Sequence, residues 1–288
     1  MAKSFEKKIE LLKEYFKKKP EILMAFLFGS RAQKRERKIS DWDIAIYLKE
    51  NDFKTENKIW SDLVDLLEKE VDLVSLNEAP PLLASKILRE GIPLKIEDKN
   101  FFLDFLLKIT EEADYFLEFS HDYYQIYQRA KSLSETEKAR LERIFIFIEN
   151  ALQEFEKFQK MSFEDYVQKI EKRRNVERWI ESLMNSILDV SKIILASKKR
   201  PLPDTYKKIV LEASHQLQLN EDLRERLSDW VALRNIIAHE YLEILWERIK
   251  DFVDNAKPYL EKFLEKAKEF KNGKGISSFF INSSIMRN

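Results

Sequence analysis

The chain has 288 residues, which is enough for two ordinary domains that each bury a core. Hydrophobic residues make up 44% and charged residues 35% of the sequence, with 4 Gly and 7 Pro, a composition that favours a folded, helix-rich protein over a disordered or turn-rich β protein. The 51 basic and 51 acidic residues balance, so any nucleic-acid contact has to come from a local patch, and the absence of Cys excludes disulfide and cysteine-nucleophile chemistry.

The start of the chain, residues 1–19, reads as a charged amphipathic helix. It contains no apolar core of the kind that a secretion signal requires. No stretch of the sequence reaches the roughly 20 uncharged apolar residues that a membrane-spanning helix needs. We therefore expect a cytoplasmic protein with no membrane partner.

Short apolar runs alternate with helical patterns between residues 21 and 97. This alternation is typical of an α+β or α/β unit whose sheet is covered by helices. Each apolar run predicts a strand, and the segments directly before and after the third run predict helices. We expect strands at 22–28, 41–48, 71–76 and 92–97, and helices near 55–69 and 80–90.

From residue 101 to about 270 the spacing changes to a helical period, with Lys and Glu on the opposite face. The fold class is therefore α+β: a mixed sheet with flanking helices, followed by an all-α helical bundle. The polar segment 131–138 resembles a helix start, and the two Pro within 197–206 predict a loop. We expect three parts: a first domain at 1–135 with its core at about 20–97, a helical domain at 136–270, and a flexible tail at 271–288.

The most informative pattern of the first half lies within residues 26–48. An apolar strand runs directly into Gly29 and Ser30, and a charged stretch of helical composition follows. Glycine permits a tight turn and a close approach to a ligand, while the start of a helix offers unpaired N–H groups to a phosphate. This turn is therefore a candidate phosphate-binding site.

Two aspartates occupy alternate positions in the next predicted strand. Because successive side chains of a strand point to opposite faces, Asp41 and Asp43 share one face. Trp42, Ile44 and Ile46 are expected to pack on the other. Paired carboxylates repel one another unless a cation lies between them, and hard oxygen ligands suit Mg²⁺ bridged to phosphates. The alternative is that these are exposed strand residues beside an ordinary turn.

A third acid, Asp72, opens the following strand and could reach the same metal, or activate an attacking hydroxyl, if the two strands are neighbours. The combined pattern resembles the polymerase-β-type nucleotidyltransferase superfamily, in particular its minimal (MNT) branch, over about 20–97. One departure is the absence of a Gly about four residues after Ser30, which alters the predicted phosphate loop. The resemblance implies ATP as substrate and Mg²⁺ as cofactor. The residues that it implies for nucleotide binding are Gly29, Ser30 and Arg31. Those that it implies for metal binding and catalysis are Asp41, Asp43 and Asp72.

The most informative pattern of the second half is WVALRNIIAHEYLEI at 230–244, which reads as an apolar helix with a few polar residues. On a straight helix, Arg234 and His239 lie about 140° apart, so a distortion or a second subunit is needed to bring both to one phosphate. His can act as a general acid or base, and Arg can stabilise phosphate charge, without a metal. The alternative is a structural His and Arg in a helical core.

The R-N-x-x-x-H-x-Y pattern, downstream of VERWIESLMNSILDVSKIIL and LPDTY, resembles the HEPN domain of the HepT-like toxin branch over about 136–265. The resemblance implies a helical, homodimeric, metal-independent ribonuclease with RNA as its substrate. Arg234 and His239 would be catalytic, with support from Asn235. In related two-gene systems an MNT partner transfers AMP to the Tyr two residues after the His, here Tyr241, and the added anion blocks and repels RNA.

We interpret the chain as a fusion of these two partners, in which an MNT domain AMPylates Tyr241, in cis or in a dimer partner, and so silences a HEPN ribonuclease. Two alternatives stay open. The first domain could transfer a nucleotide to a small-molecule hydroxyl, with the helical half shaping the acceptor pocket. The helical half could instead be a dimerisation module that binds nucleotide or RNA without cleaving it.

The remaining polar and aromatic features predict structural roles. His121 and His215 lie in plain helical contexts. Aromatic residues recur at helical spacing over 115–127 and are expected to pack between domains rather than to stack on bases. The basic run 34–38 is expected to be a solvated helix face.

Overall fold

A computed structural model provides the structure of this protein. The structure describes four stretches of the chain: residues 2–32, 42–129, 133–235 and 242–273. The basic run 34–38 and most of the predicted tail lie outside these stretches. Within the described residues, no helix is long and apolar enough to cross a membrane.

Contacts divide the chain into two compact units, Met1–Glu118 and Phe119–Asn288. Helix α5 (Lys99–Arg129) contributes residues to both units. The division by contacts therefore falls inside a helix, whereas the functional boundary near residue 135 stays a prediction.

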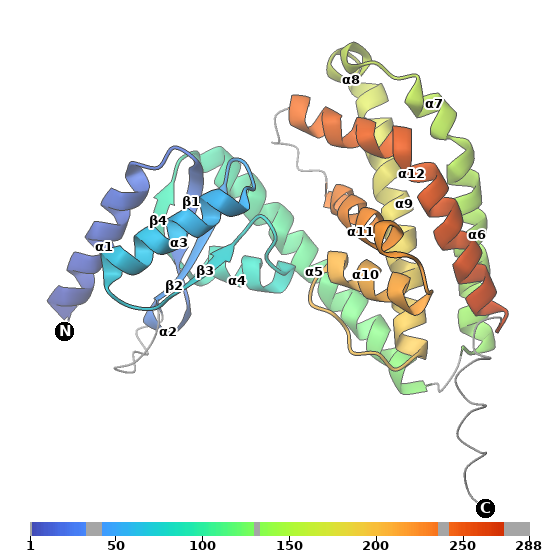
Figure 1. The fold of residues 1–288 in the computed structure, drawn as a ribbon, viewed down its shortest axis with the longest axis horizontal. Coiled ribbons are helices and arrows are strands. Elements are labelled where there is room, and N and C mark those ends of the chain that lie inside the picture. The colour runs from blue at the N-terminus through green and yellow to red at the C-terminus, as the bar shows by residue number, and fades with distance from the viewer. Residues whose placement is uncertain (1, 33–41, 130–132, 236–241, 274–288) are drawn as a thin grey trace, which may run out of the picture. The chain divides into compact units, whose positions relative to one another are not determined.

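The first unit is a four-stranded mixed sheet with the order β3-β2-β1-β4 (Figure 1). Strand β1 pairs antiparallel with β2 and β4, whereas β2 and β3 are parallel, as a helical crossover between them allows. Each strand begins and ends within one residue of its predicted bounds. The strands are β1 (Ile22–Leu27), β2 (Trp42–Leu48), β3 (Val71–Ser75) and β4 (Ile92–Ile96). The helices before α5 are α1 (Ala2–Lys17), α2 (Gly29–Ala32), α3 (Phe53–Leu67) and α4 (Pro81–Glu90).

Alternation along the strands produces two apolar layers, one on each face of the sheet. On one face, Ile44 and Ile46 of β2 belong to a core that also contains residues of α1 and α3. On the other face, the ring of Tyr47 lies 4.9 Å from that of Phe105 on α5, centroid to centroid. Both faces of β2 are therefore buried, which explains its nearly continuous apolar sequence. The predicted mixed sheet with flanking helices is confirmed.

The second unit is helical, as the period of its sequence predicts. Helix α9 is its centre, because α6, α8, α10 and the 3-10 helix η1 all contact it. Its last turns, from Val190 to Ser197, are buried on every side. The elements after α5 are α6 (Glu135–Gln153), α7 (Phe155–Gln159), α8 (Phe163–Gln168), α9 (Ile170–Ser197), α10 (Tyr206–Gln216), α11 (Glu221–Trp230), η1 (Val231–Asn235) and α12 (Leu242–Lys271).

Two helix boundaries follow directly from local sequence signals. Ser134 caps α6, and Glu137 bonds back to the Ser134 N–H at 2.7 Å, which completes a capping box. The loop predicted from the two Pro is also confirmed, since α9 ends at Ser197 and α10 begins at Tyr206.

A buried ionic cluster joins three helices of the second unit. Lys192 of α9 is only 4% exposed, and its Nζ lies 2.7 Å from Asp122 of α5 and 2.9 Å from Asp189. Arg140 of α6 approaches Asp122 to 2.8 Å. Burial opposes ionisation of Asp122, but hydrogen bonds from Lys192 and Arg140 outweigh it and lower the pKa of this carboxyl group. Asp122 is therefore ionised at neutral pH.

We predict that Lys192→Met lowers the free energy of unfolding of the second unit by about 1–3 kcal/mol, because Asp122 and Asp189 lose one of the two cations that contact them. Because the pKa of Asp122 is lowered in the folded state, its stabilising contribution is present above its unfolded pKa and is lost as the pH falls through its folded pKa. The difference between variant and wild type should therefore shrink in acid. Urea denaturation at pH 7 and in acid measures both.

The matched control is Lys208→Met on α10, which removes an exposed ion pair with Asp204 in the preceding loop. It should change the unfolding free energy by no more than about 0.5 kcal/mol. Equal losses in the two variants would show that burial of Lys192 does not matter.

Candidate active sites

The turn after β1 brings Gly29 directly against the side chain of Asp43. The Phe28 N–H donates to the Asp43 carbonyl at 2.9 Å, which extends the pairing of β1 and β2 by one bond. Gly29 follows with a φ of +71°, and a Cβ at this position would overlap Asp43 Oδ2 and lie 2.6 Å from Cγ. Only glycine tolerates both conditions. The Gly29–Ser30 turn is therefore fixed beside the carboxylate of Asp43.

The parallel pairing of β2 and β3 places Asp43 opposite Asp72. Strands pair about 4.8 Å apart, and register partners point to the same face of the sheet. Asp43 is half-buried and Asp72 is exposed. The condition under which Asp72 could join the same site, that the two strands are neighbours, is met. Trp42 and Ile44 pack in the opposite layer, as predicted.

The donor set suits a hard divalent cation, because both described carboxylates offer oxygen ligands. Among the residues that the structure describes, there is no group of three or more His, Asp or Glu side chains that could hold a metal. The third predicted ligand, Asp41, lies outside the described residues. Asp43 and Asp72 thus fit two parts of the predicted Mg²⁺ site.

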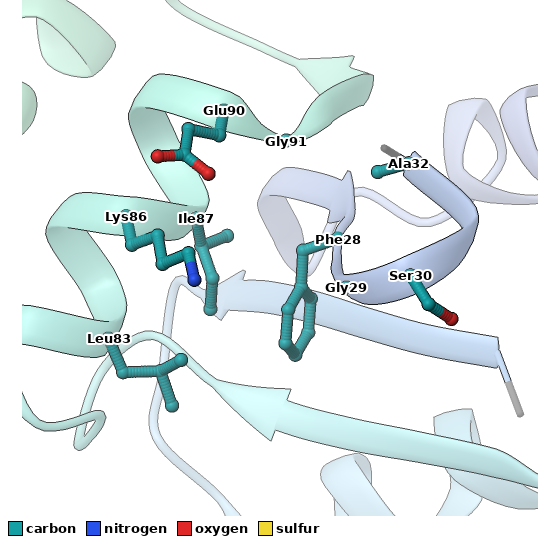
Figure 2. Close-up of a pocket in the computed structure, with 9 residues that line it drawn as sticks. All are labelled: Phe28, Gly29, Ser30, Ala32, Leu83, Lys86, Ile87, Glu90 and Gly91. Atoms are coloured by element: carbon teal, nitrogen blue, oxygen red, sulfur yellow. The ribbon is translucent and has the colours of Figure 1, made fainter. Parts of the chain in front are cut away.

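A pocket of about 360 Å³ adjoins the Gly29–Ser30 turn (Figure 2). This volume falls in the range of small-molecule sites. Phe28, Leu83 and Ile87 provide apolar walls, and the Lys86 side chain extends from α4 toward Phe28. The pocket is lined by Phe28, Gly29, Ser30, Ala32, Leu83, Lys86, Ile87, Glu90 and Gly91.

Arg31, the third residue predicted to bind nucleotide, lies elsewhere. Its guanidinium stacks over the Trp42 ring, 4.7 Å from the ring centroid. It is not among the residues that line the pocket. A nucleotide contact from Arg31 stays a prediction, whereas Gly29 and Ser30 both line the pocket.

We predict that Gly29→Ala abolishes nucleotidyl transfer, because a Cβ would displace the Asp43 carboxylate. Gly273→Ala is the matched control, since Gly273 has a φ of +72° but a Cβ added there would meet no atom within 4 Å. The control isolates the cost of the left-handed backbone, about 1–2 kcal/mol, from the steric effect. Transfer rates of both folded variants measure the difference. Retained transfer in Gly29→Ala would contradict the assigned geometry.

In the second unit, Arg234 lies in the 3-10 helix η1 and not in an α-helix. Helix α11 ends at Trp230, and η1 covers Val231–Asn235. The prediction of an apolar helix over 230–244 is therefore wrong at Arg234, whereas a distortion, one of the two conditions predicted for this segment, is present there. A 3-10 helix has three residues per turn, so the angle of 140° does not apply. The apolar spacing did not reveal this change, because η1 owes its position to contacts with α9, α10 and α11.

Arg234 is 7% exposed, and its contacts include side chains of α9 and α10. Its Nε donates a hydrogen bond to Asn185 Oδ1 on α9. Its guanidinium lies over the ring of Tyr206, the first residue of α10, with Cζ 4.4 Å from the ring centroid. The cation is thus compensated in the interior by an amide oxygen and an aromatic face.

The other predicted residues of this site are His239, Tyr241 and the Asn235 side chain. His239 and Tyr241 lie outside the described residues, and only the backbone of Asn235 is described. Their roles stay predictions. Asn185 and Tyr206 were not identified from the sequence as site residues, although Tyr206 ends the LPDTY segment that carried the resemblance.

The residues assigned structural roles lie on described helices. His121 and His215 are both exposed, and His121 Nε2 lies 2.6 Å from Gln125 Nε2 on α5. In the aromatic series over 115–127, the rings of Tyr123 and Tyr127 stack 6.0 Å apart. Both of these contacts lie within α5, whereas Phe119 of the same series meets the Tyr206 ring of α10 at 6.2 Å. Packing of the series between domains stays a prediction.

Two protein-family models match separate parts of the chain. Residues 10–100 match the family described as Polymerase beta, Nucleotidyltransferase, and residues 148–267 match the family described as Ribonuclease HepT-like. The chain therefore carries a nucleotidyltransferase domain followed by a HepT-like domain, as the sequence predicts. No curated protein is similar enough to count as a significant match.

Solved structures similar to part of the chain include toxin–antitoxin complexes. One, a toxin–antitoxin structure with AMP-PNP, is 26% identical, with 39% of this chain and 88% of that chain covered and a TM-score of 0.33. Another, the toxin–antitoxin MntA–HepT, is 23% identical, with 40% and 89% covered and a TM-score of 0.31. A third is a tri-AMPylated Shewanella oneidensis HEPN toxin in complex with its MNT antitoxin, at 22% identity, with 38% and 88% covered and a TM-score of 0.31. These TM-scores are too low to support an assignment, and the two domains are assigned from the family matches over 10–100 and 148–267.

Proposed function

We propose that the nucleotidyltransferase domain of this chain transfers AMP from ATP to Tyr241, in the same chain or in a dimer partner, and so silences a ribonuclease site in the HepT-like domain. The first half of the proposal rests on one observation, the close approach of Gly29 to Asp43. Asp43 is in turn the register partner of Asp72 on the neighbouring strand. A phosphate-binding turn and two carboxylates on one face are the parts that nucleotidyl transfer needs.

The transfer step is a displacement at the α-phosphorus of ATP. The acceptor hydroxyl oxygen forms a bond to this phosphorus, the bond to the bridging oxygen of the β-phosphate breaks, and pyrophosphate leaves. The proton of the hydroxyl passes to a base, for which Asp72 is the exposed candidate. Backbone N–H groups at Gly29 and Ser30 would bind the phosphates, and the adjoining pocket would receive the nucleotide.

The metal would be held by Asp43 and Asp72, with Asp41 as the third ligand. When bound, Mg²⁺ would neutralise charge on the phosphates and on the leaving pyrophosphate. The metal is needed because two carboxylates on one face of the sheet repel each other and the adjacent polyphosphate unless a cation lies between them.

The second domain would cleave RNA without a metal. Arg234 would stabilise negative charge on the phosphodiester, and His239 would act as general acid or base, supported by Asn235. We propose that a homodimer brings these groups together. AMP on Tyr241, two residues after His239, would place a bulky anion at the RNA-binding surface and repel the substrate.

We predict that incubation with ATP and Mg²⁺ adds one or more adenylyl groups to Tyr241, detected by intact mass and peptide mapping. Asp43→Asn should slow the transfer by about a hundredfold or more, because a ligand of the metal is lost. Asp65→Asn, an exposed aspartate on α3, is the matched control and should transfer normally. An unmodified Tyr241 with ATP turnover on added hydroxyl compounds would favour the small-molecule alternative.

We further predict that the unmodified chain cleaves RNA and that prior incubation with ATP and Mg²⁺ suppresses cleavage. Arg234→Ala and His239→Ala should each lower the rate of cleavage by about a hundredfold or more in the absence of ATP, with a measurable residual rate. Tyr241→Phe should keep the ribonuclease active after incubation with ATP, since it has no acceptor hydroxyl. RNA that is bound but never cleaved by any form would support the binding-module alternative instead.

A further inference from the structure

The guanidinium of Arg234 is held from two directions in the HepT-like domain. The hydrogen bond from Nε to Asn185 Oδ1 restricts rotation of the guanidinium within its plane. The face of the Tyr206 ring, 4.4 Å from Cζ, restricts its tilt. Together the two contacts define one orientation of a long and otherwise flexible side chain.

The two partners come from different and rigid elements. Asn185 lies in the middle of α9, the central helix of the unit. Tyr206 is the first residue of α10, and Thr205 caps that helix by accepting from the Lys208 N–H. The short helix η1 that carries Arg234 is only five residues long. The position of the guanidinium is therefore set by side chains of α9 and α10 as much as by its own backbone.

The aromatic partner is itself fixed by a further contact. The ring of Phe119 meets that of Tyr206 edge to face, at 6.2 Å and 86°. Both residues are buried, Phe119 at 3% and Tyr206 at 8% exposure. Lys192 Nζ, held in its ionic cluster, covers Phe119 at 4.6 Å. The ring beneath Arg234 thus has little freedom to move.

We propose that Asn185 and Tyr206 are positioning residues of the ribonuclease site, which hold the Arg234 guanidinium in the orientation that binds an RNA phosphodiester. Because the guanidinium is planar and rigid, the bond from Nε to Asn185 also fixes the position of the two terminal nitrogens. Holding a charged group in place before the substrate arrives lowers the reorganisation that the reaction requires. This inference rests on the proposed ribonuclease function.

The test compares cleavage of an end-labelled, mixed-sequence RNA by full-length variants without ATP. Asn185→Leu removes the acceptor at similar volume, and Tyr206→Leu removes the ring. Each should lower kcat by about ten- to a hundredfold with little change in KM, since misplacement of a charged group by about 1 Å can cost that much. Tyr206→Phe keeps the ring and should retain wild-type kcat.

Two controls separate positioning from general destabilisation. Ser186→Ala changes the neighbouring residue of α9, whose hydroxyl donates to the Ser182 carbonyl of its own helix. Tyr166→Leu removes a fully buried ring of α8 far along the sequence from Arg234. Both should keep kcat at a temperature where circular dichroism shows every variant folded.

A double-mutant cycle gives the decisive readout. In an Arg234→Ala background, Asn185→Leu and Tyr206→Leu should cause no further loss, because residues that act through one group are not additive. Further loss in that background, or wild-type kcat in both single variants, would overturn the inference while leaving the ribonuclease proposal intact. Absence of cleavage by the wild-type chain, or cleavage unaffected by Arg234→Ala, would overturn the ribonuclease proposal and the inference with it.

Discussion

The antiparallel pairing of β1 with β2 is the constraint on which the candidate site of the first unit depends. Its last hydrogen bond, from Phe28 to Asp43, leaves no room between the two strands at the next residue, and Gly29 turns there against the carboxylate. The parallel pairing of β2 with β3 then adds Asp72 on the same face. Backbone hydrogen bonds thus bring Gly29, Asp43 and Asp72 together, although these residues lie far apart in the sequence. Such bonds are less easily rearranged than side-chain contacts.

Much of this domain could be predicted from the sequence because its signals are local. Apolar alternation located each strand, and the strand period alone separated Asp43 from Trp42. The strand order could not be read in this way, since pairing depends on contacts between residues far apart in the chain. The pocket was missed for the same reason. Lys86 looks like any exposed residue of an amphipathic helix until α4 is placed beside the Gly29–Ser30 turn.

The HepT-like domain shows where local patterns stop being informative. Capping at Ser134 and the loop before Tyr206 were predictable from a few adjacent residues. The 3-10 conformation of η1 was not, because the buried residues Leu227, Trp230 and Val231 keep the i, i+3, i+4 spacing of an α-helix up to the first residue of η1. The bond from Arg234 to Asn185 joins residues 49 positions apart. No spacing rule connects them, and only the packed helices bring them together.

Helix α5 has a consequence for the supply of the two activities in a cell. Because it belongs to both compact units, one backbone carries both domains. While that helix is intact, neither domain can be synthesised, diluted or degraded without the other, so their stoichiometry is fixed at one to one. Partners encoded separately can be tuned by unequal expression or unequal lifetime. In this chain, the proposed control of the HepT-like domain by the nucleotidyltransferase domain would have to come from chemistry performed on the chain itself.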